Sequence, residues 1–186
     1  MNPERLKLLE RLKAADLKND VPSVSQDTAE FLHNLVLEHG CNNALEIGTA
    51  HAYSSIWIGD ALEQNGGQLT TIEHSDPSFN QAKVNLYRTK LEKTVTQHQG
   101  KAQAIVPTLN QTFDFIFIDG QKTHTLDFFS LCAPLLNSNG IIVVDDVIKF
   151  KDKMTSFYQW IEAQKSWQYT IEKLDKDDGI MVITKA

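Results

Sequence analysis

The sequence predicts an α/β fold in which helices cover a mostly parallel sheet. Short apolar segments typical of strands alternate along the chain with segments that carry apolar residues at helical spacing. Residues 113–119 form a near-continuous apolar run, which is typical of a central parallel strand covered on both faces. The last two strand-like segments have no helix between them and predict a hairpin. Together these observations predict one doubly wound α/β domain.

The expected helices begin with a capping pattern close to the N-terminus. Asn2 can cap a helix there, and Pro3 suits its first turn. We expect this helix within residues 1–20, either on the flank of the domain or as a lid or dimer helix, and a domain of residues 21–186 after it. Asp20 and the residues after it interrupt the helix. The other expected helices are one that Ser23 or Ser25 caps and Gly40 ends, 53–64, 77–90, a short one after Gly100, 126–136 and 154–164.

The expected strands are recognised by their β-branched and aromatic residues and by the turns that bound them. Asn65-Gly66-Gly67 ends the helix before the second strand, and Asn139-Gly140 is expected to form the turn before the fifth. Residues 175–179 are rich in aspartate and end in glycine, which predicts the hairpin turn. The expected strands are 44–48, 68–73, 94–98, 113–119, 141–146, 168–174 and 180–184.

The bulk composition is that of a globular protein. With 186 residues, the chain is long enough for one domain with a substantial core. Its net charge of −6 argues against broad contact with nucleic acid, although a local basic patch is compatible with it. Cys41 and Cys132 have no metal-ligand spacing and are expected to be reduced core thiols. Residues 1–18 are charged throughout, unlike a signal peptide, and no apolar run has membrane-spanning length, so we expect a cytoplasmic protein.

A strand, a tight turn and a helix start follow one another in residues 43–55. The apolar strand ends in Gly48, which has no Cβ and lets the backbone turn sharply beside a ligand. The following helix directs unpaired N–H groups at whatever lies over the turn. In open α/β sheets, ligands bind at the carboxyl ends of the strands. The segment alone fits an ordinary βα turn equally well.

The residues Leu45-Glu46-Ile47-Gly48-Thr49, followed by Tyr53-Ser54, resemble the first motif of the class I S-adenosylmethionine-dependent methyltransferases. They are more narrowly similar to the cation-dependent O-methyltransferases of the catechol and caffeoyl-coenzyme A type. The sequence departs from that pattern at Ala52, where the family has its second glycine. A methyl group there is expected to narrow the space beside the methionine part of the cofactor. The resemblance runs from about Val21 to Lys185.

This resemblance implies a Rossmann-like methyltransferase fold with a seven-stranded, mostly parallel sheet of order 3-2-1-4-5-7-6, in which strand seven is antiparallel. It also implies S-adenosylmethionine (SAM) as the cofactor. The residues that the resemblance assigns to SAM binding are Val24, Glu46, Gly48, Thr49, Ala50, Tyr53, Ser54, Glu73, His74, Ala102, Gln103, Asp119 and Gln121.

An acidic residue, Glu73, ends the second expected strand. A carboxylate at this position can accept hydrogen bonds from both ribose hydroxyls of an adenosine group, as it does in dinucleotide-binding folds. A solvated carboxylate at a strand end is the alternative. The family resemblance favours the contact with the ribose.

Three aspartates end the fourth and fifth expected strands. Asp119 ends one strand, and Asp145 and Asp146 end the next, so their carboxylates are expected to converge at one edge of the sheet. Like charges at short range raise one another's pKa, and a cation would relieve this repulsion. Oxygen ligands of this kind suit Mg²⁺, Mn²⁺ or Ca²⁺. The alternative is that one or two of these acids cap helices or meet solvent.

The residues around these aspartates extend the resemblance. Phe117-Ile118-Asp119-x-x-Lys122 and Val144-Asp145-Asp146-Val147 resemble the two metal-site motifs of the cation-dependent O-methyltransferases. Asp146 is a departure, since catechol-type members usually carry asparagine there and Asp-Asp is commoner in sugar-modifying members. The resemblance makes Lys122 the general base, with a pKa lowered by the cation and the sulfonium of SAM. The alternative is that Lys122 is an exposed surface lysine. His124, which departs from the family spacing, is the second candidate for the base.

These observations leave three functions open. The first is an O-methyltransferase in which the cation holds an acceptor hydroxyl, Lys122 removes its proton, and the oxygen attacks the SAM methyl group. Its acceptor is a catechol-like or other vicinal-oxygen small molecule. The second is a tRNA methyltransferase acting on a wobble 5-hydroxyuridine, with Lys149, Lys151 and Lys153 as a phosphate patch. The third is a non-catalytic cofactor-binding relative. A homodimer is compatible with each.

Only residues 147–152 separate Asp146 from the next expected helix near Met154. A segment of this length can cap a helix and present one or two side chains, but it is too short to fold over a ligand as a lid. We therefore expect an open cleft at the cation site, with Phe150 as its apolar wall.

Overall fold

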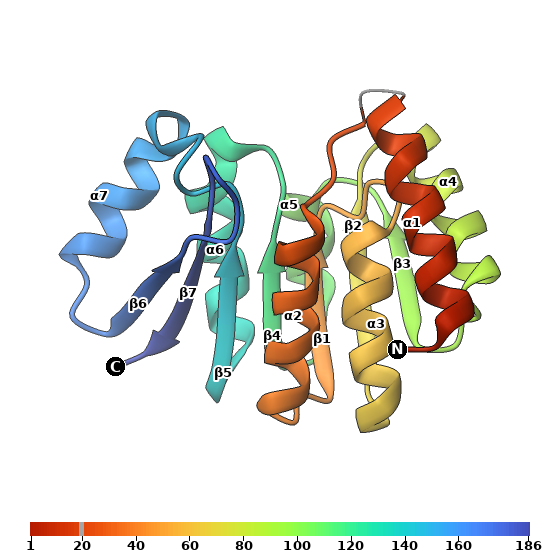
Figure 1. Ribbon diagram of the computed structural model, residues 1–186. Helices are drawn as coiled ribbons and strands as arrows, with labels where there is room; N and C mark the ends of the chain where they lie inside the picture. The colour runs from red at the N-terminus through yellow and green to blue at the C-terminus, as the bar shows by residue number, and fades with distance from the viewer. Residues whose placement is uncertain (19–20) are drawn as a thin grey trace.

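The computed structural model describes residues 1–18 and 21–186. In these residues the strands form one seven-stranded sheet in the order β3-β2-β1-β4-β5-β7-β6 (Figure 1). β7 runs antiparallel to both β5 and β6, whereas the pairs among β1 to β5 are parallel. The strand order and directions expected from the family resemblance are confirmed. Asp20, where we expected the first helix to be interrupted, lies outside the described residues.

Helices and strands alternate as the sequence predicts. The strands are β1 (Asn43–Ile47), β2 (Gln68–Glu73), β3 (Val95–Gln99), β4 (Phe113–Ile118), β5 (Leu136–Val144), β6 (Trp167–Glu172) and β7 (Ile180–Lys185). The α-helices are α1 (Pro3–Lys18), α2 (Gln26–Glu38), α3 (Tyr53–Asn65), α4 (Asp76–Arg88), α5 (Ala102–Ile105), α6 (Thr125–Cys132) and α7 (Thr155–Ala163). The short 3₁₀ helices are η1 (Val106–Thr108), η2 (Lys122–His124), η3 (Ala133–Leu135) and η4 (Lys151–Met154).

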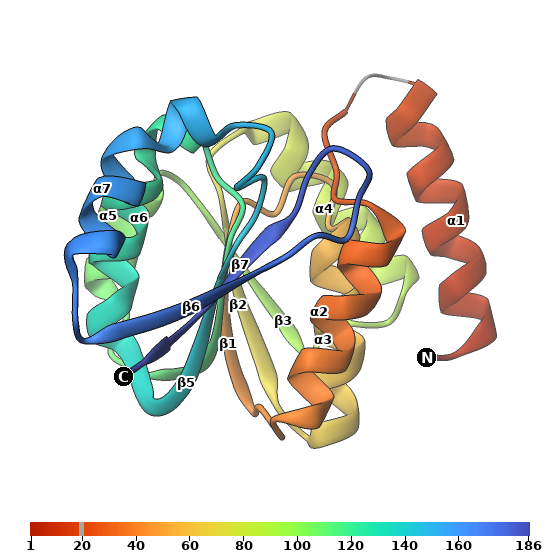
Figure 2. The same cartoon turned by 60° about the vertical axis from the view of Figure 1, so that its left-hand side comes forward.

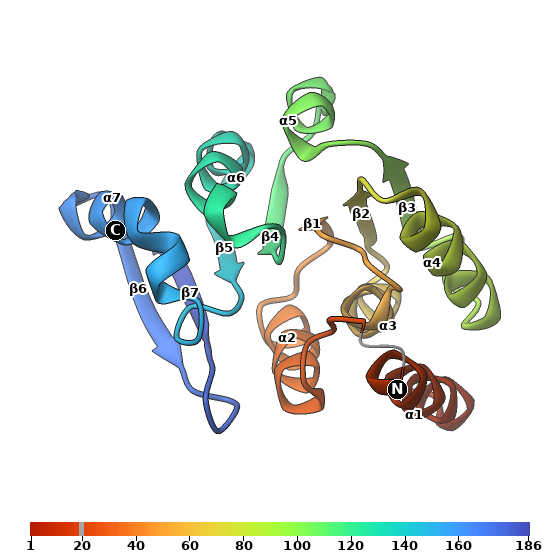
Figure 3. The same cartoon turned by 90° about the horizontal axis from the view of Figure 1, so that it is seen from above.

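Two apolar clusters fill the space between the sheet and its helices. Buried side chains of α2, α3 and α4 form one cluster, which Leu9 of α1 joins. Side chains of α5, α6 and α7 form the other, with Phe113 of β4. Figure 2 shows the two helical layers on opposite sides of the sheet, and Figure 3 shows α1 outside α3. The central strands are therefore covered on both faces, which explains the continuous apolar run in β4.

The turn expected at Asn139-Gly140 is wrong, because both residues lie inside β5. The pairing of β4 with β5 shifts its register between Phe113 and Phe115. Such an irregularity takes up extra residues in one strand without ending it. Glycine suits position 140 because an added Cβ would lie 3.0 Å from the carbonyl oxygen of Asp114. The Asn-Gly pair therefore marks a distortion of a strand rather than a turn between elements.

α1 packs on the flank of the domain through a buried ion pair. Arg5 is 8% exposed and donates from Nη1 to Asp60 Oδ1 over 2.5 Å and from Nη2 to the carbonyl oxygen of Thr89 over 2.9 Å. Asp60 of α3 also contacts His33 Nε2 of α2 at 3.0 Å, so three helices share one carboxylate. Hydrogen bonds between charged groups are roughly twice as strong as neutral ones. The flank is one of the positions that we expected for α1.

Two smaller expectations, a serine cap on α2 and two buried free thiols, are confirmed. Ser25 caps α2, because its hydroxyl oxygen accepts a hydrogen bond from the backbone N–H of Thr28 over 3.0 Å. Cys41 and Cys132 are buried free thiols. Among the described residues, no helix is long and apolar enough to cross a membrane.

Candidate active site

The carboxyl ends of the central strands surround a cavity of about 700 Å³. The predicted site residues that line it are Gly48, Ala50, Glu73, His74, Ala102, Gln103, Asp119, Gln121, Lys122 and Asp146. A smaller cavity also contacts Gly48, Ala50 and Asp119, and the further predicted residues that line it are Val24, Thr49, Tyr53 and Ser54. Glu46 and Asp145 are buried and line neither of these two cavities. The fold therefore gathers most of the residues that the sequence singles out.

The turn after β1 approaches β4 too closely for any side chain at Gly48. A Cβ added there would lie 2.3 Å from the carbonyl oxygen of Asp119. The φ angle of Gly48 is +103°, which an L-residue rarely adopts. Both observations require glycine at this position. They also explain how the turn comes to lie directly beside the first of the three aspartates.

Ala52 stands in the left-handed region, with a φ angle of +69°. Its side chain is fully buried in the apolar core and lines neither cavity. The Ala52 methyl group therefore packs in the core, and the narrowing that we expected beside the cofactor stays a prediction. The methyl group also costs about 1–2 kcal/mol of backbone strain, which the glycine of the family pattern would avoid.

Glu46 is a fully buried carboxylate that fixes the start of α3. Its Oε1 accepts from the Ser54 hydroxyl over 2.6 Å, and its Oε2 accepts from Thr71 over 2.6 Å and from Ser55. The hydroxyl of Thr49 lies 2.5 Å from that of Thr71, which links the turn to the same network. Burial raises the pKa of Glu46 to about 7, against the opposing effect of these hydroxyl donors. Glu46 therefore shapes the turn from beside the cavity.

Glu73 lines the cavity at the end of β2 and joins two loops. Its Oε2 accepts from the backbone N–H of Ala50 over 2.9 Å, and its Oε1 accepts from that of Ser75 over 2.7 Å. The residue is only 6% exposed, so it is a fixed, buried acceptor rather than the solvated carboxylate of the alternative interpretation. His74 Nδ1 lies 3.3 Å from Glu73 Oε1, but its side chain is largely exposed.

Asp119, Asp145 and Asp146 each offer a carboxylate oxygen, and these oxygens lie within 4.8 Å of one another. Backbone pairing continues past the strand ends and holds the chain there, since Asp119 N donates to Ile47 O over 2.9 Å and Asp145 N donates to Ile118 O over 3.1 Å. Within the described residues, this is the one group of acidic, histidine or cysteine side chains that could hold a metal ion. Three converging oxygen donors fit Mg²⁺, Mn²⁺ or Ca²⁺.

The pKa values of the aspartates reflect this crowding. Burial raises the pKa of Asp145 well above its ordinary value, and the charge of Asp119 raises it further. Burial also raises the pKa of Asp146 to about 6, while Lys122 opposes the shift. The cluster is therefore an environment in which additional positive charge is favourable.

Lys122 lies inside this cluster rather than at the open surface. Its Nζ is 2.6 Å from Asp119 Oδ1 and 2.7 Å from Asp146 Oδ2, and its side chain is 14% exposed. Burial lowers the pKa of Lys122, but the charges of the three aspartates outweigh burial and raise the pKa well above its ordinary value. The lowered pKa expected from the sequence applies to Lys122 beside a bound cation and SAM, and for that state it stays a prediction. His124 also lines the cavity.

Asp178, in the loop between β6 and β7, is a site residue that the sequence analysis missed. Its Oδ1 accepts from the backbone N–H groups of Ile148 and Lys149, both over 3.2 Å, and from that of Gly179 over 2.7 Å. Its carboxyl group also neighbours that of Asp146 and contributes to the raised pKa there. Asp178 thus ties the hairpin to the segment that follows β5. The Asp-Gly pair signalled a turn, but no local pattern signalled this distant contact.

The segment after Asp146 does not wall the large cavity. Phe150, which we expected as the apolar wall, is not among the residues that line the cavity, whereas Phe128 of α6 is. The side chains of Asp119 and Asp146 are 23% and 27% exposed, as an open cleft requires. The predicted open cleft therefore has its aromatic wall on another element.

Comparison with known proteins identifies this arrangement. A family model described as a methyltransferase domain matches residues 45–147. A catechol O-methyltransferase from Niastella koreensis is 36% identical over 131 residues, which cover 68% of this chain and 59% of that protein. The O-methyltransferase from Bacillus cereus in complex with SAH has a TM-score of 0.87 at 27% identity, covering 96% of this chain and 91% of that chain. The O-methyltransferase TomG from Streptomyces achromogenes, in complex with SAM, has a TM-score of 0.86 at 26% identity. The match covers 100% of this chain and 91% of the TomG chain.

The sheet order and the cavity at the carboxyl ends of its strands define a Rossmann-like methyltransferase fold. The chain belongs to the methyltransferase-domain family. The resemblance to SAM-dependent O-methyltransferases that the motifs indicated is confirmed by these relatives. The chain spans 59% and 58% of the lengths of two curated catechol O-methyltransferases that it matches, those of Niastella koreensis and Mycobacterium tuberculosis.

Replacing Glu46 with glutamine tests the buried carboxylate. Its pKa in the folded protein is about 7, against an ordinary value of 4.5, so the folded state binds this proton more tightly than the unfolded state. The stability that Glu46 contributes is therefore fully present below pH 4.5 and is lost as the pH rises through about 7. Between these limits, the free energy of unfolding should fall by about 3 kcal/mol more in the wild type than in Glu46→Gln.

Urea denaturation of both proteins across this pH range measures the difference. Glu92→Gln is the control, because Glu92 is an exposed carboxylate. Parallel stability profiles for wild type and Glu46→Gln would contradict the raised pKa.

Proposed function

We propose that the chain is a SAM-dependent O-methyltransferase assisted by a divalent cation. The observation that carries this proposal is that the aspartate cluster and the turn at Gly48 meet at one cavity. The methyltransferase-domain family and the relatives in complex with SAH and SAM support the donor and the reaction class. The similar catechol O-methyltransferase supports an acceptor that is a small molecule with adjacent hydroxyl groups. We also propose that the protein acts in the cytoplasm.

The lining residues divide into a donor side and an acceptor side. On the donor side, the Gly48 turn would contact the methionine part of SAM, Glu73 would accept hydrogen bonds from the ribose hydroxyls, and Gln103 would contact the adenine. On the acceptor side, Asp119, Asp145 and Asp146 would hold the cation. When bound, a divalent cation lowers the pKa of a hydroxyl group that contacts it.

Lys122 is the residue that we propose as the acceptor of the hydroxyl proton. Its Nζ lies in the cavity within hydrogen-bond distance of Asp119 and Asp146. A lysine accepts a proton only when it is neutral, and the surrounding carboxylates favour its charged form. Positive charge bound by the three aspartates would offset that preference. By holding donor and acceptor in one cavity, the protein contributes mainly orientation, since the sulfonium of SAM is already activated.

Glu73→Ala should weaken SAM binding by roughly 10- to 100-fold, because a buried charged acceptor of the ribose hydroxyls is lost. Isothermal calorimetry with SAM measures the affinity, and thermal unfolding shows whether the loops that Glu73 joins stay folded. Glu92→Ala, which removes an exposed carboxylate outside the cavity, is the control. Unchanged affinity in a folded Glu73→Ala protein would exclude this residue from the cofactor site.

A chelator should abolish methyl transfer to a catechol, and Mg²⁺ or Mn²⁺ should restore it. Asp145→Asn should weaken Mn²⁺ binding in calorimetry as well as activity, because one of three converging oxygen ligands loses its charge. Lys122→Ala should lower kcat by roughly 10²- to 10⁴-fold. Glu38→Ala, which removes an exposed carboxylate that lines neither cavity, is the control. Full activity of the chelated protein would rule out the metal role.

A hydroxylated wobble uridine in tRNA is a second candidate acceptor, favoured by one surface feature. Lys149 and Lys153 lie over the ring of Phe150 at 5.3 and 4.8 Å, and Lys151 lies over the ring of Tyr158 at 4.8 Å. Contacts with aromatic faces hold three positive charges close to the end of β5, where they could bind phosphates. The net charge of −6 disfavours a larger nucleic-acid surface. A non-catalytic role is disfavoured by the intact aspartate cluster with its lysine.

A Lys149→Glu, Lys151→Glu double variant separates the two acceptor classes. Methylation of tRNA should fall and lose its salt dependence, because two positive charges that attract phosphates are replaced by negative charges that repel them. Methylation of a neutral catechol should continue at the wild-type rate. Equal loss of both reactions would argue that these lysines act on the fold rather than on an anionic acceptor.

A further inference from the structure

The segment that follows α1 forms one wall of the cofactor cavity. Val21 and Pro22 line the large cavity, and Pro22, Ser23 and Val24 line the small one. The opposite wall of the small cavity includes the turn from Gly48 to His51. A ligand held between these walls therefore depends on the distance between two segments that belong to different parts of the chain.

Lys13 holds the first wall from the last part of α1. Its Nζ donates to the carbonyl oxygen of Ser23 over 3.0 Å, to the Ser23 hydroxyl over 2.9 Å and to the carbonyl oxygen of Val24 over 2.7 Å. The same ammonium group lies 5.2 Å from the centre of the Tyr53 ring at the start of α3. One side chain thus uses all three of its donors on the wall segment and also packs on the turn side.

Asp16, nearly one helical turn further along α1, holds the second wall. It is 1% exposed, and its Oδ1 lies 2.7 Å from Nδ1 of His51 in the turn. The carbonyl oxygen of Asp16 also accepts from the backbone N–H of Val21 over 2.9 Å, so this residue contacts both walls. His51 is held from its other side, because its carbonyl oxygen accepts from the Asn85 side chain over 2.9 Å. Asp16 Oδ2 is buried and has no hydrogen-bond partner among the described residues.

We propose that Lys13 and Asp16 form a clamp at the C-terminal end of α1 that sets the distance between the two walls and thereby positions SAM. The inference rests on the proposed function in one respect, that this cavity is the SAM site. Both residues act through others, Lys13 through Ser23 and Val24 and Asp16 through His51, so they are positioning residues. Neither is required to touch the reacting atoms.

Calorimetry with S-adenosylhomocysteine tests the clamp without knowledge of the acceptor. Lys13→Met removes three hydrogen bonds to one wall, and Asp16→Ala removes the contact with His51. Each should raise the Kd for S-adenosylhomocysteine by roughly 10-fold, because the wall that each variant loosens must be ordered again when the ligand binds. Lys13→Arg and Asp16→Asn should restore most of the affinity, since a donor and an acceptor remain in place.

A double-mutant cycle tests whether Asp16 affects ligand binding through its contact with His51. Asp16→Ala and His51→Ala should each weaken binding, and the double variant should weaken it no further than either alone, because both break the same contact. Lys13→Met with His51→Ala should instead multiply the two losses, because these residues hold different walls. If the losses of affinity in Asp16→Ala and His51→Ala add up in the double variant, the proposal that Asp16 acts through His51 is overturned.

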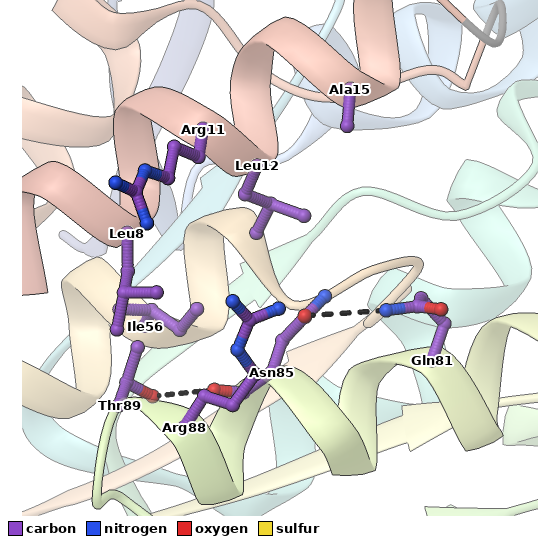
Figure 4. Close-up of a pocket in the computed structure, with 9 residues that line it drawn as sticks. All are labelled: Leu8, Arg11, Leu12, Ala15, Ile56, Gln81, Asn85, Arg88 and Thr89. Carbon is purple, nitrogen blue, oxygen red and sulfur yellow. Dashed lines mark hydrogen bonds between the residues drawn. The ribbon is translucent and has the colours of Figure 1, made fainter.

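The control is Arg11→Met on the same helix. Arg11 lines a separate groove of about 130 Å³ between α1 and α4, together with Arg88 of α4 (Figure 4). This groove shares no lining residue with the two cavities of the proposed SAM site. Arg11→Met should leave the Kd unchanged. An equal loss of affinity in Arg11→Met would assign the effect to general loosening of α1 and overturn the clamp.

Comparison with Glu73→Ala distinguishes a failure of the clamp from a failure of the proposed function. If wild-type protein binds S-adenosylhomocysteine and Glu73→Ala weakens that binding, unchanged affinity in folded Lys13→Met and Asp16→Ala proteins overturns the clamp alone. If Glu73→Ala has no effect, the location of the cofactor site fails, and the clamp fails with it. Should Asp16→Ala not fold, His51→Ala and Lys13→Met decide the question, because His51→Ala breaks the same contact with Asp16 and Lys13→Met keeps a side chain of similar length.

Discussion

The close approach of the Gly48 backbone to the Asp119 carbonyl is the constraint on which the proposed site depends. A side chain at Gly48 would lie 2.3 Å from that oxygen and force the ends of β1 and β4 apart. Because they stay together, the turn that would bind the donor lies beside the first residue of the aspartate cluster. The buried carboxylate of Glu46 fixes the helix that follows the turn. The proposed donor and acceptor sites thus share one cavity through backbone geometry rather than through flexible side chains.

The electrostatics of the site follow from this crowding. Three aspartates and Lys122 lie together, and burial together with their mutual charges shifts the pKa values of Asp145, Asp146 and Lys122. The same carboxylates that suit a divalent cation also favour the charged form of the proposed base. Occupation of the cluster by positive charge and the availability of Lys122 are therefore linked.

Local patterns predicted most of the elements, because helix caps, glycine turns and apolar spacing act over a few residues. Ser25 caps α2 as its position suggests, and the apolar run of residues 113–119 is the central strand β4. The turn predicted at Asn139-Gly140 was wrong because the same dipeptide occurs both in turns and in irregular strands. Pairing with the neighbouring strand decides which of the two forms. The strand order came from the family resemblance, since periodicity does not record which strands are neighbours.

The sequence by itself determined the fold class, the acidic residues at the strand ends and the glycine turn, because these depend on residue type and local spacing. Only the tertiary structure decided that Lys122 lies among the three aspartates, that Asp178 braces the segment after β5, and that α1 reaches both walls of the cavity through Lys13 and Asp16. Each of these features depends on the distance between groups on different elements. Such distances are set by how the helices and strands pack, which no local pattern in the chain records.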